Sequence, residues 1–350
     1  MSTITSLLDF FEQSNIRCRI FDMGRRVVPL GKQAFGQFEQ GKATYPYPLQ
    51  NQAWLGLLCW PGDDTARHFI WFLRLPLDET GHVSYAARDD LLSRLAQMAE
   101  SGLSGDDSEE VQQPLEENPY GFKPTEDRMA VFHAKALKAL GLPPSKFYEH
   151  ARDYFDGKTG FDQWAFVGMQ GIADLAARVD EEDNAQCLAK AVPGLPEAPF
   201  EALAKCLENE PIPTVLSEAI AAHMNNELNK DAPNPTLLSL GLRALALAPA
   251  QGLRRELMQN ILKSSLASDI NILVAISGRS WEDLLDKDLR KLYLEALANN
   301  AEGQAVFNRV LVDLFFIDGM REPIMTSLRD PERSDTLASA IGKFFAALRQ

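Results

Sequence analysis

The stretch Ser101–Phe122, SGLSGDDSEEVQQPLEENPYGF, divides the sequence into two parts of different character. It contains six of the chain's 49 acidic residues and no basic residue. Its first part has few branched or aromatic side chains, so it cannot bury enough apolar surface to offset the entropy of ordering. We therefore predict an acidic flexible linker over 101–118, between a domain at 1–100 and a second domain at 119–350.

The end of this stretch differs from its beginning, because Tyr120 and Phe122 lie just before a helix start at Thr125. We expect these two rings to pack onto the helical part and to anchor the linker there. An alternative role for the acidic portion is to dock on a basic surface of a partner protein.

Two short segments of the front part predict a β-hairpin. Ile16–Ile20 alternates with period two, as a half-buried strand does, and Arg26–Leu30 can return as its partner. The turn between them contains Asp22 and Gly24. Because glycine tolerates positive φ, we expect that backbone conformation at Gly24.

Two further segments predict the centre of an antiparallel sheet. Ala53–Trp60 (AWLGLLCW) and His68–Leu75 (HFIWFLRL) are rich in aromatic and branched residues and are joined by a Pro-Gly turn. An apolar stripe over 85–99 predicts a helix that closes the unit. The front part is therefore expected to be a small α+β domain.

The second part shows helical periodicity throughout. Thr125 can cap a helix that ends near Leu140, and the next two helices are expected over Ser145–Phe155 and Phe161–Val179. Further helices are predicted over about 181–191, 198–209, 213–229, 235–247, 250–266, 269–276, 281–298, 302–317, 321–329 and 333–349. The fold class that follows is α+β, with a large all-α part after the small sheet.

Two pairs of similar segments raise the question of a repeat. Leu242–Ala246 is echoed by Leu294–Ala298 at a separation of 52 residues, whereas Phe200–Pro211 and Leu238–Pro249 are 38 residues apart. A regular solenoid would keep one period. We therefore predict an irregular HEAT-like array of paired helices, a class whose usual work is to hold other proteins.

Catalytic and metal-binding patterns are weak in this sequence. The five histidines contain no HExxH arrangement, and the four cysteines have no metal-ligand spacing. We interpret Cys18, Cys59, Cys187 and Cys206 as buried thiols. The sequence predicts no cofactor and no metal ion, and it favours a protein without catalytic activity over an enzyme.

Charge and hydropathy indicate the compartment and the kind of partner. The formal net charge is −14, which opposes binding to a phosphate backbone, so nucleic acid is disfavoured. The chain has no signal-peptide pattern and no run of about 20 apolar residues that could span a membrane. We expect a cytoplasmic protein without a membrane span.

Three segments carry a resemblance to a known family. FIWFLRLPLDETG (69–81), AARDDLL (86–92) and NPYGFKPTEDRMAVFHAKAL (118–137) resemble a family of uncharacterised bacterial proteins that is known only as a domain of unknown function. The resemblance extends over most of the chain. It implies a cytoplasmic bacterial protein and brings no activity, cofactor or site residue.

The leading hypothesis is a non-enzymatic scaffold or adaptor, whose helical part binds a protein partner and whose front domain binds a second element or forms a homodimer. The second is an enzyme or small-ligand protein with a site between the two parts, for which the candidate binding residues are Tyr120, Phe122, His133 and Trp164. The third is a nucleic-acid-binding helical array. That reading requires Arg243, Arg254, Arg255 and Lys263 to converge on one groove.

Overall fold

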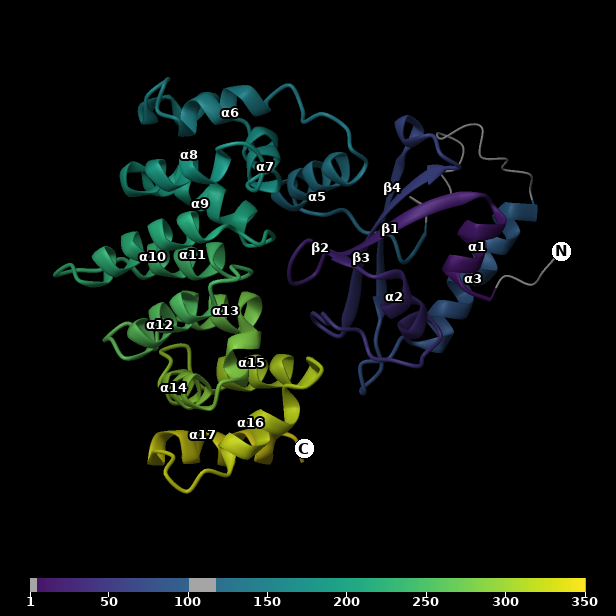
Figure 1. Ribbon diagram of the computed structural model, residues 1–350. Helices are drawn as coiled ribbons and strands as arrows, with labels where there is room; N and C mark the ends of the chain where they lie inside the picture. Colours follow the sequence, from purple (N-terminus) through teal and green to yellow (C-terminus); the bar gives the residue numbers. More distant parts are fainter. Residues whose placement is uncertain (1–4, 101–117, 350) are drawn as a thin grey trace. The chain divides into compact units, whose positions relative to one another are not determined.

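The computed structural model describes residues 5–100 and 118–349, which form two compact units (Figure 1). The first unit comprises the chain up to Arg128 together with 316–318, and the second comprises 129–315 and 319–350. The predicted linker, 101–118, lies outside the described residues except for Asn118.

The first unit is built on a four-stranded antiparallel sheet, as the sequence predicts. Its strands are β1 (Ile16–Asp22), β2 (Val28–Leu30), β3 (Gln52–Pro61) and β4 (Phe69–Pro76), in the order β2-β1-β3-β4. Of the two strands predicted for the centre, β3 is an inner strand, whereas β4 is the last in this order. Trp60 of β3 pairs with Arg17 of β1, and the two longest strands, β3 and β4, are paired from Gln52 to Cys59 of β3. This register places alternate side chains of each strand on the same face.

The helices of this unit, α1 (Leu7–Gln13), α2 (Lys32–Glu39) and α3 (Tyr85–Glu100), cover one face of the sheet. A short 3-10 turn, η1 (Thr65–Arg67), joins β3 to β4. The helices and the sheet share one apolar core, which includes Leu7, Phe10, Phe35, Phe38, Leu91 and Leu95 on the helices and Ile20, Leu55, Leu57, Trp71 and Leu73 on the strands. Helix α2 is not predicted by the sequence, because Gly31 at its start offers no capping side chain.

The turn between β1 and β2 is shaped by the buried carboxylate of Asp22. It accepts hydrogen bonds from the backbone N–H groups of Gly24, Arg25 and Arg26, and from the hydroxyl of Tyr45. The prediction of positive φ at Gly24 is wrong. Space is tight there instead, since a Cβ would lie 3.0 Å from Cδ1 of Trp54 and the indole ring would have to shift to accommodate it.

The segment Tyr120–Phe122 adds to the edge of β4. The N–H of Arg74 donates to the carbonyl of Tyr120 at 2.7 Å, and the N–H of Phe122 donates to the carbonyl of Phe72 at 3.2 Å. Pro124 has no N–H group, so the added strand cannot continue much further along that edge.

The side chains of this segment correct our expectation that they pack onto the helical part. The ring of Phe122 contacts Trp54 and Phe72, with centroids 4.9 and 5.8 Å apart, and the Tyr120 hydroxyl donates to Asp90 at 3.1 Å. Both rings are therefore anchored on the sheet unit. The error arose because a three-residue strand has too few residues to show a period.

A buried glutamate fixes the start of α1. Glu39 is 4% exposed, and its Oε1 accepts the N–H of Leu7 at the first turn of that helix. Its Oε2 is buried without a hydrogen-bond partner among the described residues. Burial raises the pKa of Glu39 to about 7, against the opposing effect of the backbone N–H groups of Leu7 and Leu8.

The second unit is all-α and contains the remaining helices. They are α5 (Glu126–Ala139, whose first turn belongs to the first unit), α6 (Tyr148–Phe155), α7 (Met169–Ala177), α8 (Asn184–Ala191), α9 (Glu197–Leu207), α10 (Thr214–Leu228), α11 (Pro235–Ala244), α12 (Gln251–Leu262), α13 (Ile270–Arg279), α14 (Lys287–Ala298), α15 (Gln304–Phe316), α16 (Arg321–Leu328) and α17 (Asp335–Ala347). Short 3-10 turns lie at η2 (Phe161–Phe166), η3 (Val192–Gly194) and η4 (Trp281–Leu285). The predicted fold class is confirmed.

These helices stack in two rows. Helices α6, α8, α10, α12 and α14 contact one another in succession, and α7, α9, α11 and α13 form the second row (Figure 1). Each layer therefore contributes one helix to each row, as in HEAT-like arrays. The layers differ in length: α8, α10, α12 and α14 begin at residues 184, 214, 251 and 287.

The stacking explains the two sequence echoes. Phe200–Pro211 and Leu238–Pro249 cover α9 and α11, which are neighbours in one row. Leu242–Ala246 and Leu294–Ala298 instead belong to α11 and α14, which lie in different rows. Only the separation of 38 residues therefore relates equivalent helices.

Two predicted helices are interrupted. The prediction of one helix over Phe161–Val179 is wrong, because the chain leaves η2 at Val167 and Gly168 starts α7 in extended conformation. Close packing explains why residue 171 is a glycine, since a Cβ there would lie 2.4 Å from the carbonyl oxygen of Phe147. The expected helix 281–298 divides at Asp286, whose carboxylate caps α14.

Buried arginines link successive layers of the array. Arg254 is the fourth residue of α12, and its guanidinium bonds the carboxylate of Asp283 through two nitrogens and the carbonyl of Ala248 at 2.8 Å. Arg290 is the fourth residue of α14 and donates to the carbonyl of Leu284 at 2.8 Å and the hydroxyl of Ser327 at 2.8 Å. Both arginines connect their helix to the next layer, Arg254 through an ion pair and Arg290 through neutral hydrogen bonds.

Replacing Arg254 by Met should destabilise the helical unit by about 3–5 kcal/mol, because it leaves the Asp283 carboxylate buried and without its main partner. Urea unfolding followed by far-ultraviolet circular dichroism measures the loss, since the helical unit dominates that signal. Arg255→Met is the matched control: its side chain is 38% exposed and contacts the same carboxylate at 3.1 Å. An equal loss of stability in both variants would contradict the role of Arg254 as the main partner of Asp283.

A second prediction concerns pH. Because the pKa of Glu39 is raised in the folded state, its contribution to stability is complete below the unfolded value of about 4.5 and is lost as pH rises through about 7. The loss is on the order of 3 kcal/mol. Glu39→Gln keeps an acceptor for the Leu7 N–H and carries no charge, so the variant should be more stable than wild type at pH 8.

Amide hydrogen exchange of peptides from α1 and β1, corrected for the intrinsic pH dependence of exchange, measures this effect in the first unit alone. Glu12→Gln, which removes an exposed carboxylate from α1, should retain the wild-type pH dependence. If the Glu39→Gln variant also retains the wild-type pH dependence of stability, the buried Glu39 carboxylate is not the source of that dependence.

Candidate ligand site

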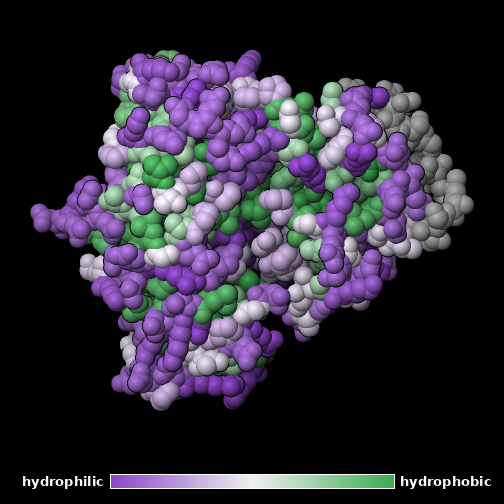
Figure 2. All heavy atoms as spheres, in the orientation of Figure 1, coloured by the Kyte–Doolittle hydropathy of each residue, from purple (hydrophilic) through white to green (hydrophobic). Residues whose placement is uncertain are grey.

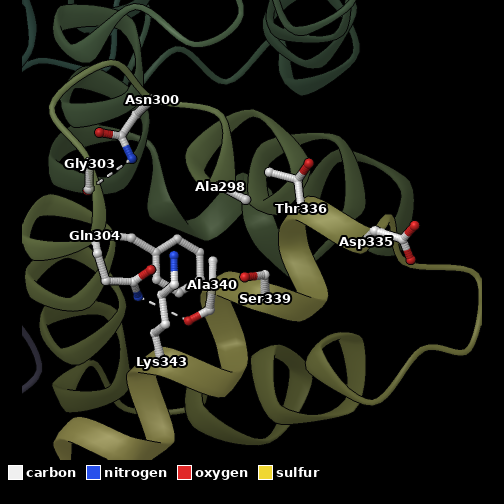
Figure 3. A pocket seen from close by; sticks show the side chains of 10 residues that line it. Ala298, Asn300, Gly303, Gln304, Asp335, Thr336, Ser339, Ala340 and Lys343 are labelled. Atoms are coloured by element: carbon white, nitrogen blue, oxygen red, sulfur yellow. Dashed lines mark hydrogen bonds between the residues drawn. The ribbon is translucent and has the colours of Figure 1, made fainter.

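A cavity of about 500 Å³ opens near the end of the helical array (Figure 3). It lies where the segment after α14 and the first turns of α15 meet α17. Its lining residues are Ala298, Asn300, Gly303, Gln304, Phe307, Asp335, Thr336, Ser339, Ala340 and Lys343. Its volume is within the range of small-molecule sites, about 300–1,000 Å³.

Helix α17 supplies one wall through residues on a single face. Thr336, Ser339, Ala340 and Lys343 recur at the spacing that brings helical side chains into line. The helix starts here because the Ser334 hydroxyl accepts the N–H of Leu337 at 3.1 Å. The small side chains in the middle of this face leave the space of the cavity, and Figure 3 shows the long Lys343 side chain beside it.

Two amides form the facing wall. Asn300 donates to the carbonyl of Leu297 at 2.7 Å, and Gln304 donates to the carbonyl of Ala340 at 2.9 Å and to the side-chain oxygen of Asn308 at 2.7 Å. Both N–H donors of the Gln304 amide are therefore used. Its carbonyl oxygen is the group left to accept a hydrogen bond from a ligand.

The cavity lining contains one cation and one anion, both exposed. Lys343 and Asp335 are eight residues apart on α17, which separates their backbones by about 12 Å at 1.5 Å per residue. Hydroxyl groups of Thr336 and Ser339 lie between them. The lining has no histidine, cysteine or glutamate, so this arrangement is suited to binding a polar molecule rather than to acid–base chemistry.

The four residues proposed from the sequence lie elsewhere. Tyr120 and Phe122 belong to the first unit, His133 is exposed on α5, and Trp164 is half-buried in η2, with its ring 5.8 Å from that of Tyr154. None of them lines the cavity. Their role in binding remains a prediction, and the exposure of His133 leaves that residue without the enclosing pocket that an acid–base role would favour.

Sequence reasoning missed the cavity. Its walls come from 298–307 and 335–343, and the only signal within either segment is the run of small residues beside Lys343 on α17. That pattern is common in helices that pack closely, so it does not identify a site by itself.

The cysteine prediction is confirmed: Cys18, Cys59, Cys187 and Cys206 are free and buried. Burial raises the pKa of Cys187 to about 11 and that of Cys59 well above its ordinary value, so both thiols stay protonated near neutral pH. In the part of the chain that the structure describes, no three His, Cys, Asp or Glu side chains group as a metal site would require. Over the same residues, no helix combines the length and apolar character needed to cross a membrane.

The molecule is thus a two-unit α+β protein, with a small antiparallel sheet and a two-row helical array. The chain belongs to the family described as Protein of unknown function (DUF3549), whose model matches residues 2–345. This confirms the resemblance to a family of unknown function, while the bacterial source remains a prediction. No curated protein and no solved structure matches the chain.

Proposed function

We propose that the chain is a protein-interaction scaffold, whose helical array binds a segment of a partner protein. The observation that carries the proposal is the two-row stack itself, because each layer adds surface in one direction and such arrays present long faces to other proteins. Buried ion pairs between layers, such as Arg254 with Asp283, support a fixed spacing of that surface.

Partly exposed apolar residues at the starts of three first-row helices, which we call the apolar line, are the candidate contact surface. Val215 in the first turn of α10 is 40% exposed, Leu253 in the first turn of α12 is half-buried, and Leu285 just before α14 is 52% exposed. These three residues lie at the beginnings of helices that stack in succession. Figure 2 shows apolar patches recurring between hydrophilic ridges on the face of the array in view.

Contiguous apolar patches rimmed by polar residues are typical of protein-binding surfaces. The partner that fits the apolar line is a polypeptide segment with apolar anchors spaced over three layers. Helical arrays without a catalytic group commonly bind extended or helical segments in this way.

The nucleic-acid hypothesis loses support from the arginines it requires. Arg254 and Arg255 both bond the carboxylate of Asp283, and Arg243 bonds that of Glu208. Arginines engaged with carboxylates are poor partners for phosphate groups, since binding a phosphate would first break the internal pair.

The proposal includes a cytoplasmic location, which the four free thiols support because oxidising compartments favour disulfides. A homodimer through the front domain is a further proposal. It is tested by the molecular mass of the intact chain in solution at several concentrations.

Capture from a lysate of the source organism tests the scaffold proposal. Val215→Glu combined with Leu285→Glu should abolish retention of a specific protein that the wild-type chain retains, because each change places a charge in the apolar line. Val274→Glu is the matched control, since Val274 is 49% exposed and lies on α13 in the other row.

The captured protein is identified by mass spectrometry, and its direct binding to the purified chain is then measured. Retention of no protein at low salt argues against a scaffold. Equal retention by wild type, the double variant and the control would leave the array as a scaffold but exclude the apolar line as its surface.

A further inference from the structure

We propose that the cavity between α15 and α17 binds a peptide end, with the peptide carboxylate on Lys343. The site is separate from the apolar line, so either proposal can fail without the other. No sequence motif indicates it, because its groups come from two segments that only the fold brings together.

The charge arrangement favours a carboxylate over a phosphate. Lys343 is the single cation of the lining and is exposed, so it can approach a ligand oxygen without breaking an internal ion pair of the described residues. One ammonium group matches the single charge of a carboxylate. The carboxylate of Asp335 in the same lining opposes a doubly charged phosphate.

The groups between the two charges favour a peptide over a simple organic acid. The hydroxyls of Thr336 and Ser339 and the carbonyl oxygen of Gln304 offer donors and acceptors along the cavity, as a peptide backbone requires. An extended tripeptide spans about 10 Å at 3.3–3.6 Å per residue, close to the separation of Asp335 and Lys343 along α17. Asp335 lies at the other end of the lining and is exposed, so its side chain can turn to accept an ammonium group there.

Two kinds of molecule carry such a peptide carboxylate: a free short peptide and the C-terminus of a protein. Three probes distinguish them: trialanine has both charges, N-acetyl-trialanine has only the carboxylate, and trialanine amide has only the ammonium group. Ligand-detected NMR with the intact chain measures the dissociation constant of each.

Trialanine should bind about ten-fold or more tightly than its amide, because the amide loses a charge-assisted hydrogen bond. The Lys343→Met substitution should weaken the binding of trialanine by the same factor and leave the binding of trialanine amide unchanged. Lys190→Met removes an exposed lysine from α8 and is the matched control, with no change expected. Ser339→Leu replaces an exposed residue and fills the cavity, so it should weaken trialanine as well.

N-acetyl-trialanine decides the source. If it binds as tightly as trialanine, the ligand is the C-terminus of a longer chain; if it binds about ten-fold more weakly, the ligand is a free peptide and Asp335→Asn should remove that difference. No binding of trialanine at millimolar concentration would overturn the proposal. Equal binding of trialanine and its amide, or an unchanged difference in the Lys343→Met variant, would overturn it too.

Discussion

The buried pairing of Arg254 with Asp283 is the interaction on which the stacking of the array depends. It joins the start of α12 to the turn before α14, and Arg255 adds a second contact to the same carboxylate. A charge taken out of water is costly unless its partner is in place, so we expect the pair to favour one arrangement of the two layers.

Buried arginines connect layers elsewhere in both rows as well. Arg290 repeats the position of Arg254 one layer later and reaches Ser327 of α16. In the other row, Glu208 after α9 accepts bonds from Arg243 of α11 and Arg279 of α13, and although burial opposes its charge, the two guanidinium groups hold its pKa below the usual value. Buried arginines therefore connect neighbouring layers through ion pairs and neutral hydrogen bonds, and we expect these contacts to hold the spacing of the surface that we propose for protein binding.

Most of the fold could be predicted because its signals are local. The strands β3 and β4 follow from their aromatic and branched residues, and the helices of the array follow from apolar spacing of 3.6 residues. The elements that were predicted wrongly or not at all depend on tertiary contacts. The edge strand at Tyr120–Phe122 exists only because β4 offers it hydrogen bonds, and the helix expected from Phe161 to Val179 is interrupted where Gly168 turns the chain. The cavity was missed for the same reason, since Gln304 and Lys343 are brought together only by the packing of α15 against α17.

The central claim is that the array behaves as one body whose layers hold a fixed spacing. Native-state hydrogen exchange of the intact chain, resolved by mass spectrometry to peptides from α10, α12 and α14, tests it most directly. We expect these three helices to share one opening free energy and to lose protection together as urea is added. Separate opening of each helix pair, with α10 protected while α12 and α14 exchange at their own rates, would contradict it.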